Sequence, residues 1–359
     1  MKNLLLVGAA TLVASCSQNI DEGVASTNKE ITFSHLNARI TRADKLHNGA
    51  NDNSDDYKVY AAIAQEDTKI GSSPITKPLE STNWYFVDEV YGKTTDRGTA
   101  NQPKKGPYYW LSSGAALDFY AYAPASVVAT GEPGNLNIAY TVNDRADEDL
   151  TIASPIENMT FEKTAPLGVI NLQFYHVLSK IVISAELSNE LTQSGYTIEP
   201  NYTASLTMKH KMGNISPTGS DRQWSIPSGE NGNATYSGRT SYMVLPQDVE
   251  GNSLQLDDLV IKKNGLQVFP AKTHGGKSST GKSLKKYILK ASDIINGEKD
   301  IKDDLIRNDG TFMPGKQYNF KIVISNLSFD ENGNPVFGKE IKFDANVADW
   351  SEERTSIRQ

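Results

Sequence analysis

The stretch "VINLQFYHVLSKIVISAEL", residues 169–187, carries the strongest structural signal in the 359-residue chain. Large side chains recur in it at every second position before two isoleucines extend the pattern: Leu172, Phe174, His176, Leu178, Ile181 and Ile183. A period of two is typical of a half-buried β-strand with one face in water. The stretch therefore predicts one long strand and a chain built mainly from sheets.

Shorter runs elsewhere have the same character, because they are rich in aromatic and β-branched residues and are bounded by Gly, Pro, Asn, Asp or Ser. They are "YKVYAAIAQ" (57–65), "NWYFVDEVY" (83–91), "LDFYAYAP" (117–124), "LNIAYTV" (136–142) and "TSYMVLP" (240–246). Such spacing is typical of antiparallel sandwiches or barrels. Near the C-terminus, "QYNFKIVISNLSF" and "NPVFGKEIKF" flank Asn332-Gly333, which predicts a hairpin. Only residues 289–307 have helical character.

A division of the chain is indicated at "FEKTAPLG" (161–168), where Pro166 and Gly168 interrupt the sequence before the long strand. The length is sufficient for two domains of ordinary size. We therefore expect an all-β fold with two antiparallel β-sandwich domains in tandem, at residues 43–166 and 167–359.

The N-terminus has the order of a secretory signal, with Lys2, an apolar run to Val13 and small residues at 14 and 15. The run is too short to span a bilayer, which takes about 20 residues. Cys16, the only cysteine, follows directly, as in a bacterial lipobox. We predict a signal peptide at 1–15 and lipidation of Cys16, since a lone extracellular thiol has no disulfide partner and several acyl chains hold a protein on a membrane. The alternative is a chance cysteine beside an ordinary cleavage site.

Composition excludes some classes of function. A net charge of −7 and a pI near 5.4, with no basic stripe, argue against nucleic-acid binding. The segment 276–283, "GKSSTGKS", matches the phosphate-loop pattern. A phosphate loop lies between a buried parallel strand and a helix, but here Pro270 precedes it and the βαβ pattern is missing. A hairpin is the better interpretation of this region.

No catalytic or metal site is predicted. The five histidines have no metal-ligand spacing, and His176 is better explained as a packed or hydrogen-bonded residue. Nucleophile-elbow and zinc-protease signatures are missing, and the acidic loops at 51–56 and 330–335 lack the spacing of a calcium loop. We expect no enzyme activity, no cofactor and no metal.

The segment "EITFSHLNARITRADK" (30–45) joins a strand-like run to a polar loop, with Arg39 and Arg42 between them. Basic residues at such a junction are favourable sites for a trypsin-like protease. The alternative is that both arginines are ordinary surface charges.

Several of these features occur together in one known family. The lipobox, a strand followed by "TRA", "LDFYAYAP", "DLTIASP" (149–155), "FYHVLSKI", "PGKQYNFKIVI" (314–324) and "VADW" (347–350) resemble the fimbrillin family, the subunits of type V, protease-assembled pili of Gram-negative anaerobes. The resemblance implies two transthyretin-like β-sandwiches and export as a lipoprotein. It also implies cleavage after an arginine and replacement of the removed first strand by a strand of a neighbouring subunit.

Carried onto this chain, the resemblance places the removable strand at about 30–40 in a lipidated propeptide, 16–42. The cut is expected after Arg42, with Arg39 as the alternative. Ile31, Phe33 and Leu36 are the expected plug residues, although Leu36 breaks the alternation and implies a bulge near His35. The implied partners are other fimbrial subunits, the outer membrane through lipid on Cys16, an arginine-specific protease and a receptor. The implied location is the fimbrium and the outer membrane.

Two roles remain open. The polar end "SEERTSIRQ" favours a tip or accessory subunit that contributes to adhesion, unless "FGKEIKFDANVADW" supplies the donor strand. The alternative is an uncleaved surface lipoprotein, either a fimbrium anchor or a glycan binder. A binding platform would use Trp84, Tyr108, Tyr109 and Trp110, but core packing is the better explanation of most of them.

Overall fold

The computed structural model describes residues 29–35, 56–64, 69–70, 73–74, 84–91, 106–111, 116–143, 148–164, 169–219, 222–226, 234–270, 287–290, 310–325, 327–329, 335–337 and 341–349. Within these ranges the helical elements are α1 (Asn189–Gln193) and the 3-10 helix η2 (Phe161–Lys163), and the rest of the regular structure is strand. The predicted all-β class is confirmed. No helix in these ranges is long and apolar enough to cross a bilayer.

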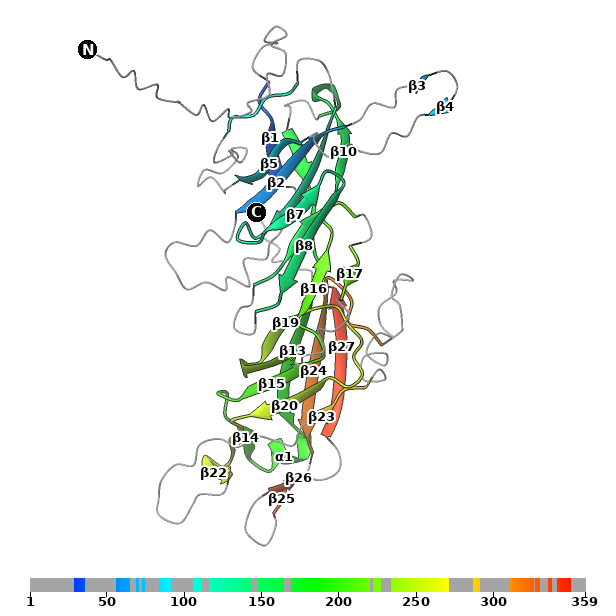
Figure 1. Cartoon of the computed structure of the whole chain (residues 1–359). Helices are drawn as coiled ribbons and strands as arrows, with labels where there is room; N and C mark the ends of the chain where they lie inside the picture. Colours follow the sequence, from blue (N-terminus) through cyan, green and yellow to red (C-terminus); the bar gives the residue numbers. More distant parts are fainter. Residues whose placement is uncertain are drawn as a thin grey trace, which may run out of the picture.

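An antiparallel sheet lies at one end of the molecule, with the strand order β12-β9-β6-β2-β5 and with β10 paired to β6 (Figure 1). Its strands are β2 (Tyr57–Ile63), β5 (Trp84–Tyr91), β6 (Leu117–Ala123), β9 (Thr151–Ala153), β10 (Ile156–Met159) and β12 (Phe174–His176). The runs predicted at 57–65, 83–91 and 117–124 are β2, β5 and β6.

The central strands β2 and β6 are buried on both faces. Successive side chains of a strand point to opposite sides, so each strand contributes to two apolar clusters. In β6, Phe119 and Ala121 belong to one apolar cluster, whereas Tyr120 and Tyr122 belong to another. The first of these clusters lies at the N-terminal end of the fold, and the second extends into the other half of the chain.

The other half contains a sheet with half-buried strands in the order β19-β13-β24-β27. β13 and β24 are parallel and β27 is antiparallel to β24 along nine residue pairs. Alternating burial in β13 and β24 matches one face in the core and one in water. The strands are β13 (Ser179–Leu187), β19 (Ser241–Val244), β24 (Lys316–Ile324) and β27 (Ile341–Asp349).

Smaller sheets complete this half. One has the order β18-β15-β20-β23 and another the order β14-β21-β22, while β25 and β26 form the predicted hairpin. β3 (Lys69–Ile70) and β4 (Ser73–Pro74) pair in the first half. The remaining bounds are β14 (Tyr196–Ile198), β15 (Thr203–Met208), β18 (Ala234–Arg239), β20 (Ser253–Asp257), β21 (Ile261–Lys263), β22 (Leu266–Phe269), β23 (Tyr287–Ile288), β25 (Leu327–Phe329) and β26 (Pro335–Phe337).

The middle of the elongated molecule is a sheet that joins its two halves, in the order β17-β16-β8-β7 (Figure 1). Two strands come from the first half of the chain, β7 (Ala129–Glu132) and β8 (Asn135–Thr141), and two from the second, β16 (Met212–Ile215) and β17 (Trp224–Ser225). Strand pairing thus crosses residue 166, and the position of a domain boundary there stays a prediction.

The prediction of one long strand over 169–187 is wrong. The stretch forms β11 (Val169–Leu172), β12 and β13, which pair with different partners. Val177 and Leu178 are both buried although they are consecutive, so the buried positions change parity between β12 and β13. One flat strand cannot direct consecutive side chains into the same core.

Candidate functional site

The candidate site is the position of the N-terminal segment, residues 29–35, which contains β1 (Thr32–His35). β1 runs parallel to β11 with Phe33 opposite Ile170. Just before β1, the Ile31 N–H donates to the Tyr108 carbonyl at 2.8 Å, and the Trp110 N–H donates to the Lys29 carbonyl at 3.0 Å. The N-terminal segment therefore has backbone partners in β11 and in the segment 106–111.

Two predicted plug residues, Ile31 and Phe33, are 0% exposed and belong to the same apolar cluster. The Phe33 ring makes edge contacts with Tyr91 and Phe119, at centroid distances of 4.8 and 5.4 Å. Each such buried side chain contributes about 1.5–3 kcal/mol. The other predicted residues, Leu36, Arg39, Arg42 and Cys16, lie outside the described residues, so their roles stay predictions.

Aromatic residues from several elements line the site. Tyr91 of β5 stacks on Tyr57 of β2 at 5.8 Å, and Tyr57 contacts Phe174 of β12 at 5.5 Å. Trp110 contacts Phe119 of β6 at 6.0 Å. The sequence predicts strands at most of these residues but not their convergence, because convergence depends on which strands become neighbours.

Several polar atoms near the site are buried. Glu89 of β5 is 0% exposed and accepts a hydrogen bond from the Tyr108 hydroxyl at 2.8 Å. Burial, followed by the hydrogen bond to Glu89, raises the pKa of Tyr108 to about 12. Glu30 Oε1, the Tyr91 hydroxyl and Trp110 Nε1 are buried without a hydrogen-bond partner in the described part of the chain.

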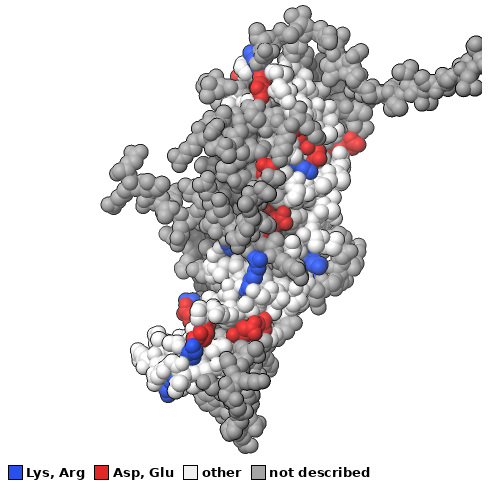
Figure 2. Space-filling model, turned by 90° about the vertical axis from the view of Figure 1, so that its left-hand side faces the viewer, with Lys and Arg blue, Asp and Glu red and all other residues white. Residues whose placement is uncertain are grey.

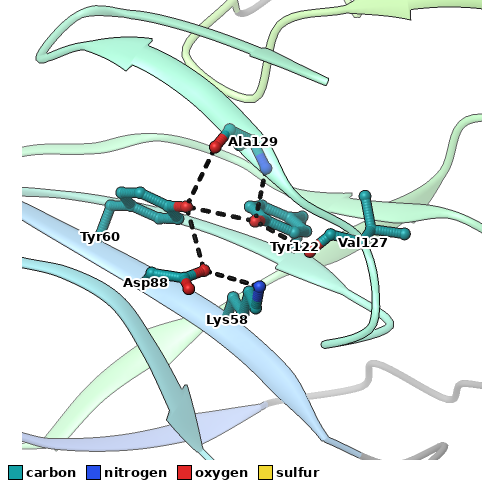
Figure 3. Close-up of polar contacts among 6 residues, drawn as sticks. All are labelled: Lys58, Tyr60, Asp88, Tyr122, Val127 and Ala129. Carbon is teal, nitrogen blue, oxygen red and sulfur yellow. Dashed lines mark hydrogen bonds and ion pairs between the residues drawn. The ribbon is translucent and has the colours of Figure 1, made fainter. Parts of the chain in front are cut away.

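On the other face of β2, a polar network ties strands together (Figure 3). The Lys58 Nζ lies 2.7 Å from Asp88, whose carboxylate also accepts from the Tyr60 hydroxyl at 3.2 Å. The Tyr122 hydroxyl accepts from the Ala129 N–H at 3.0 Å. Asp88 has a φ of 54°, a conformation that Asp tolerates better than most residues. The network links β5, β2, β6 and β7, which gives it a structural role.

The predicted aromatic platform is not assembled as one surface. Trp110 is buried, Trp84 and Tyr108 are half-buried against Tyr60 and Phe86, and Tyr109 is the member exposed at 42%. The interpretation of most of these residues as core is confirmed.

Other sequence candidates also receive structural explanations. His176 forms a side-chain hydrogen bond with Asp149, as expected for a hydrogen-bonded residue. The phosphate-loop match lies outside the described residues, but the strand before it, β22, is antiparallel to β21, whereas a phosphate loop follows a parallel strand. Among described residues, no cluster of His, Cys, Asp and Glu suited to a metal occurs. Acidic and basic side chains are interspersed on the face in Figure 2.

One sequence signal connects the site to the opposite end of the chain. Residues 29–33 read Lys-Glu-Ile-Thr-Phe, and residues 339–343 read Lys-Glu-Ile-Lys-Phe. The second copy leads into β27, which begins at Ile341. The two buried residues of the N-terminal segment, Ile31 and Phe33, therefore have counterparts in Ile341 and Phe343, a repeat that strand patterns and motifs alone do not indicate.

These observations define an all-β protein of the sandwich class, with an N-terminal strand embedded in its core. The chain belongs to the fimbrillin-like family, whose model matches residues 41–350. This is a family of structural fimbrial and adhesin subunits, as the sequence resemblance predicted.

Solved structures show a similar fold at low sequence identity. A fimbrial protein from Bacteroides vulgatus is 14% identical, with 90% of this chain and 100% of that chain covered and a TM-score of 0.53. A fimbrilin from Porphyromonas gingivalis is 12% identical, with 90% and 97% covered and a TM-score of 0.41. A comparison with curated protein sequences found no significant match.

Proposed function

We propose that this chain is the precursor of a fimbrial subunit whose N-terminal segment occupies a site meant for a strand of another subunit. The precursor is exported as a lipoprotein through Cys16 and cut after Arg42, or after Arg39. The propeptide 16–42 then leaves with β1. The observation that carries the proposal is the full burial of Ile31 and Phe33 in a segment that precedes the matched family region, 41–350.

The physical basis is strand addition. A strand between two partners gains main-chain hydrogen bonds from its edges and specificity from pockets for alternate side chains. Removal of the N-terminal segment would uncover the aromatic rings around Phe33 and the backbone edges of β11 and 106–111. An exposed apolar edge of this kind favours pairing with another chain.

The repeat at 339–343 supports β27 of a second copy as the incoming strand. With Ile341 at the position of Ile31 and Phe343 at that of Phe33, the incoming strand would present the same apolar side chains to the same pockets. β27 lies in the half of the molecule remote from β1 (Figure 1), which favours a neighbouring copy over the same chain. It is also an edge strand, so it can leave β24 without disrupting a second ladder.

This partner bears on the role of the subunit. A chain that carries both the site and a matching strand can polymerise with further copies of itself, which supports a position in the shaft of the fimbrium. The tip or accessory role remains the alternative, since the polar residues 351–359 provide no apolar strand of their own.

The test uses residues 17–359 treated with an arginine-specific protease. We expect one discrete cut with a new N-terminus at Ala43, loss of the fragment and formation of multimers. Arg42→Ala should abolish that cut, whereas Arg39→Ala serves as the matched control. An intact monomer after digestion would contradict the proposal and favour the uncleaved surface lipoprotein. Lipidation is tested separately, by the mass of the membrane-bound precursor and of its Cys16→Ser variant.

A further inference from the structure

The N-terminal segment contains two fully buried apolar residues and, next to them, an acidic residue with an unpaired buried oxygen atom. Ile31 and Phe33 are fully buried, but the residue before them, Glu30, places its Oε1 atom out of contact with water and without a hydrogen-bond donor in the described part of the chain. An unpaired buried carboxylate oxygen destabilises the state that contains it, because the lost hydration is not replaced.

The backbone fixes Glu30 in this position. Glu30 forms an isolated bridge with Tyr109, and the residues on either side of it are hydrogen-bonded to 108 and 110. The backbone on both sides of Glu30 is therefore held in place, while the residue itself is half-buried.

The neighbourhood already contains a buried acid. Glu89 is 0% exposed and lies against the Tyr108 hydroxyl. Burial raises the pKa of Tyr91, and Tyr57, Glu89, Tyr108 and Glu30 all act in the same direction. Both carboxylates are thus close enough to act on one phenol.

We propose that Glu30 is the release element of the N-terminal segment, an acidic position that limits how tightly any strand is held in the site. The inference rests on the proposed function and adds the residue that sets the rate of strand exchange. Glu340 occupies the same place in the repeat at 339–343, so the incoming strand would carry the same acid and the site would stay exchangeable.

The experiment measures release without dependence on the natural protease. A site for a specific protease is inserted between residues 42 and 43 of the 17–359 chain, the purified protein is cut, and loss of the 17–42 fragment is followed in the presence of a peptide of residues 339–349. Glu30→Gln removes the charge and keeps the shape. We expect release about tenfold slower than in the unmodified chain, as the penalty for an unpaired buried group indicates. Glu186→Gln, on the half-exposed strand β13, is the control and should change nothing.

Equal rates for Glu30→Gln and the unmodified chain would overturn the inference alone. No release from either chain, even with excess peptide, would overturn the proposed strand exchange.

Discussion

Replacement of Phe33 by alanine should weaken the hold on the N-terminal segment far more than any other single change in β1. The side chain is 0% exposed and makes two edge contacts with aromatic rings. Truncation of a buried phenylalanine costs about 3–5 kcal/mol, and a value near 4 corresponds to about three decades in an equilibrium constant. After the chain is cut between 42 and 43, the fragment from Phe33→Ala should therefore dissociate about a thousand times more readily.

The assay is gel filtration of the cut protein at a series of dilutions, with the fragment quantified by mass spectrometry. Thr32→Ala is the matched control, since Thr32 is half-buried on the same strand. Circular dichroism of the cut protein reports whether the rest of the fold is intact. Equal retention of the Phe33→Ala and Thr32→Ala fragments would refute the assignment of Phe33 as the anchor of the segment.

Three further predictions concern stability. Asp88→Ala should lower the free energy of unfolding by about 2 kcal/mol, and Lys58→Met by less, because only the first leaves a buried ammonium group without its carboxylate; equal urea midpoints would contradict this. Gly213→Ala should cost about 1–3 kcal/mol, since a Cβ there would lie 2.9 Å from the Trp224 ring, and an unchanged melting temperature would count against the close packing of the middle sheet. Burial raises the pKa of Tyr91, Tyr108 and Tyr120, so these groups keep protons that the unfolded chain loses near pH 10, and stability should fall as the pH rises above about 10; the check is the urea midpoint at pH 9 and 11 together with tyrosinate absorbance.

The strands were predictable because short runs of β-branched and aromatic residues between turn residues carry a local signal. β6 shows the limit of that signal: "LDFYAYA" predicts a strand, but its burial on both faces depends on two clusters built from distant segments. The break in 169–187 has a local trace in the consecutive apolar pair Val177-Leu178. No local signal indicates that the three strands pair with β1, β9 and β24, since this pairing depends on residues far away in the chain.

The candidate site was partly predictable from the resemblance to the family. That resemblance gave Ile31 and Phe33 as plug residues, and the structure places both in the core. The poor solvation of Glu30 had no signal in the sequence, because it follows from the residues that lie opposite it. The repeat at 29–33 and 339–343 is readable in the sequence, but only the structure shows that both copies lead into strands, β1 and β27.

The sheet that joins the two halves has a mechanical consequence. β8 and β16 run along the long axis of the molecule and are paired from Met212 opposite Thr141 to Ile215 opposite Ile138 (Figure 1). A pulling force on the two ends acts parallel to these strands, while their hydrogen bonds lie across it. The bonds are then loaded together in shear instead of being opened one after another, so the middle of the molecule is built to resist tension.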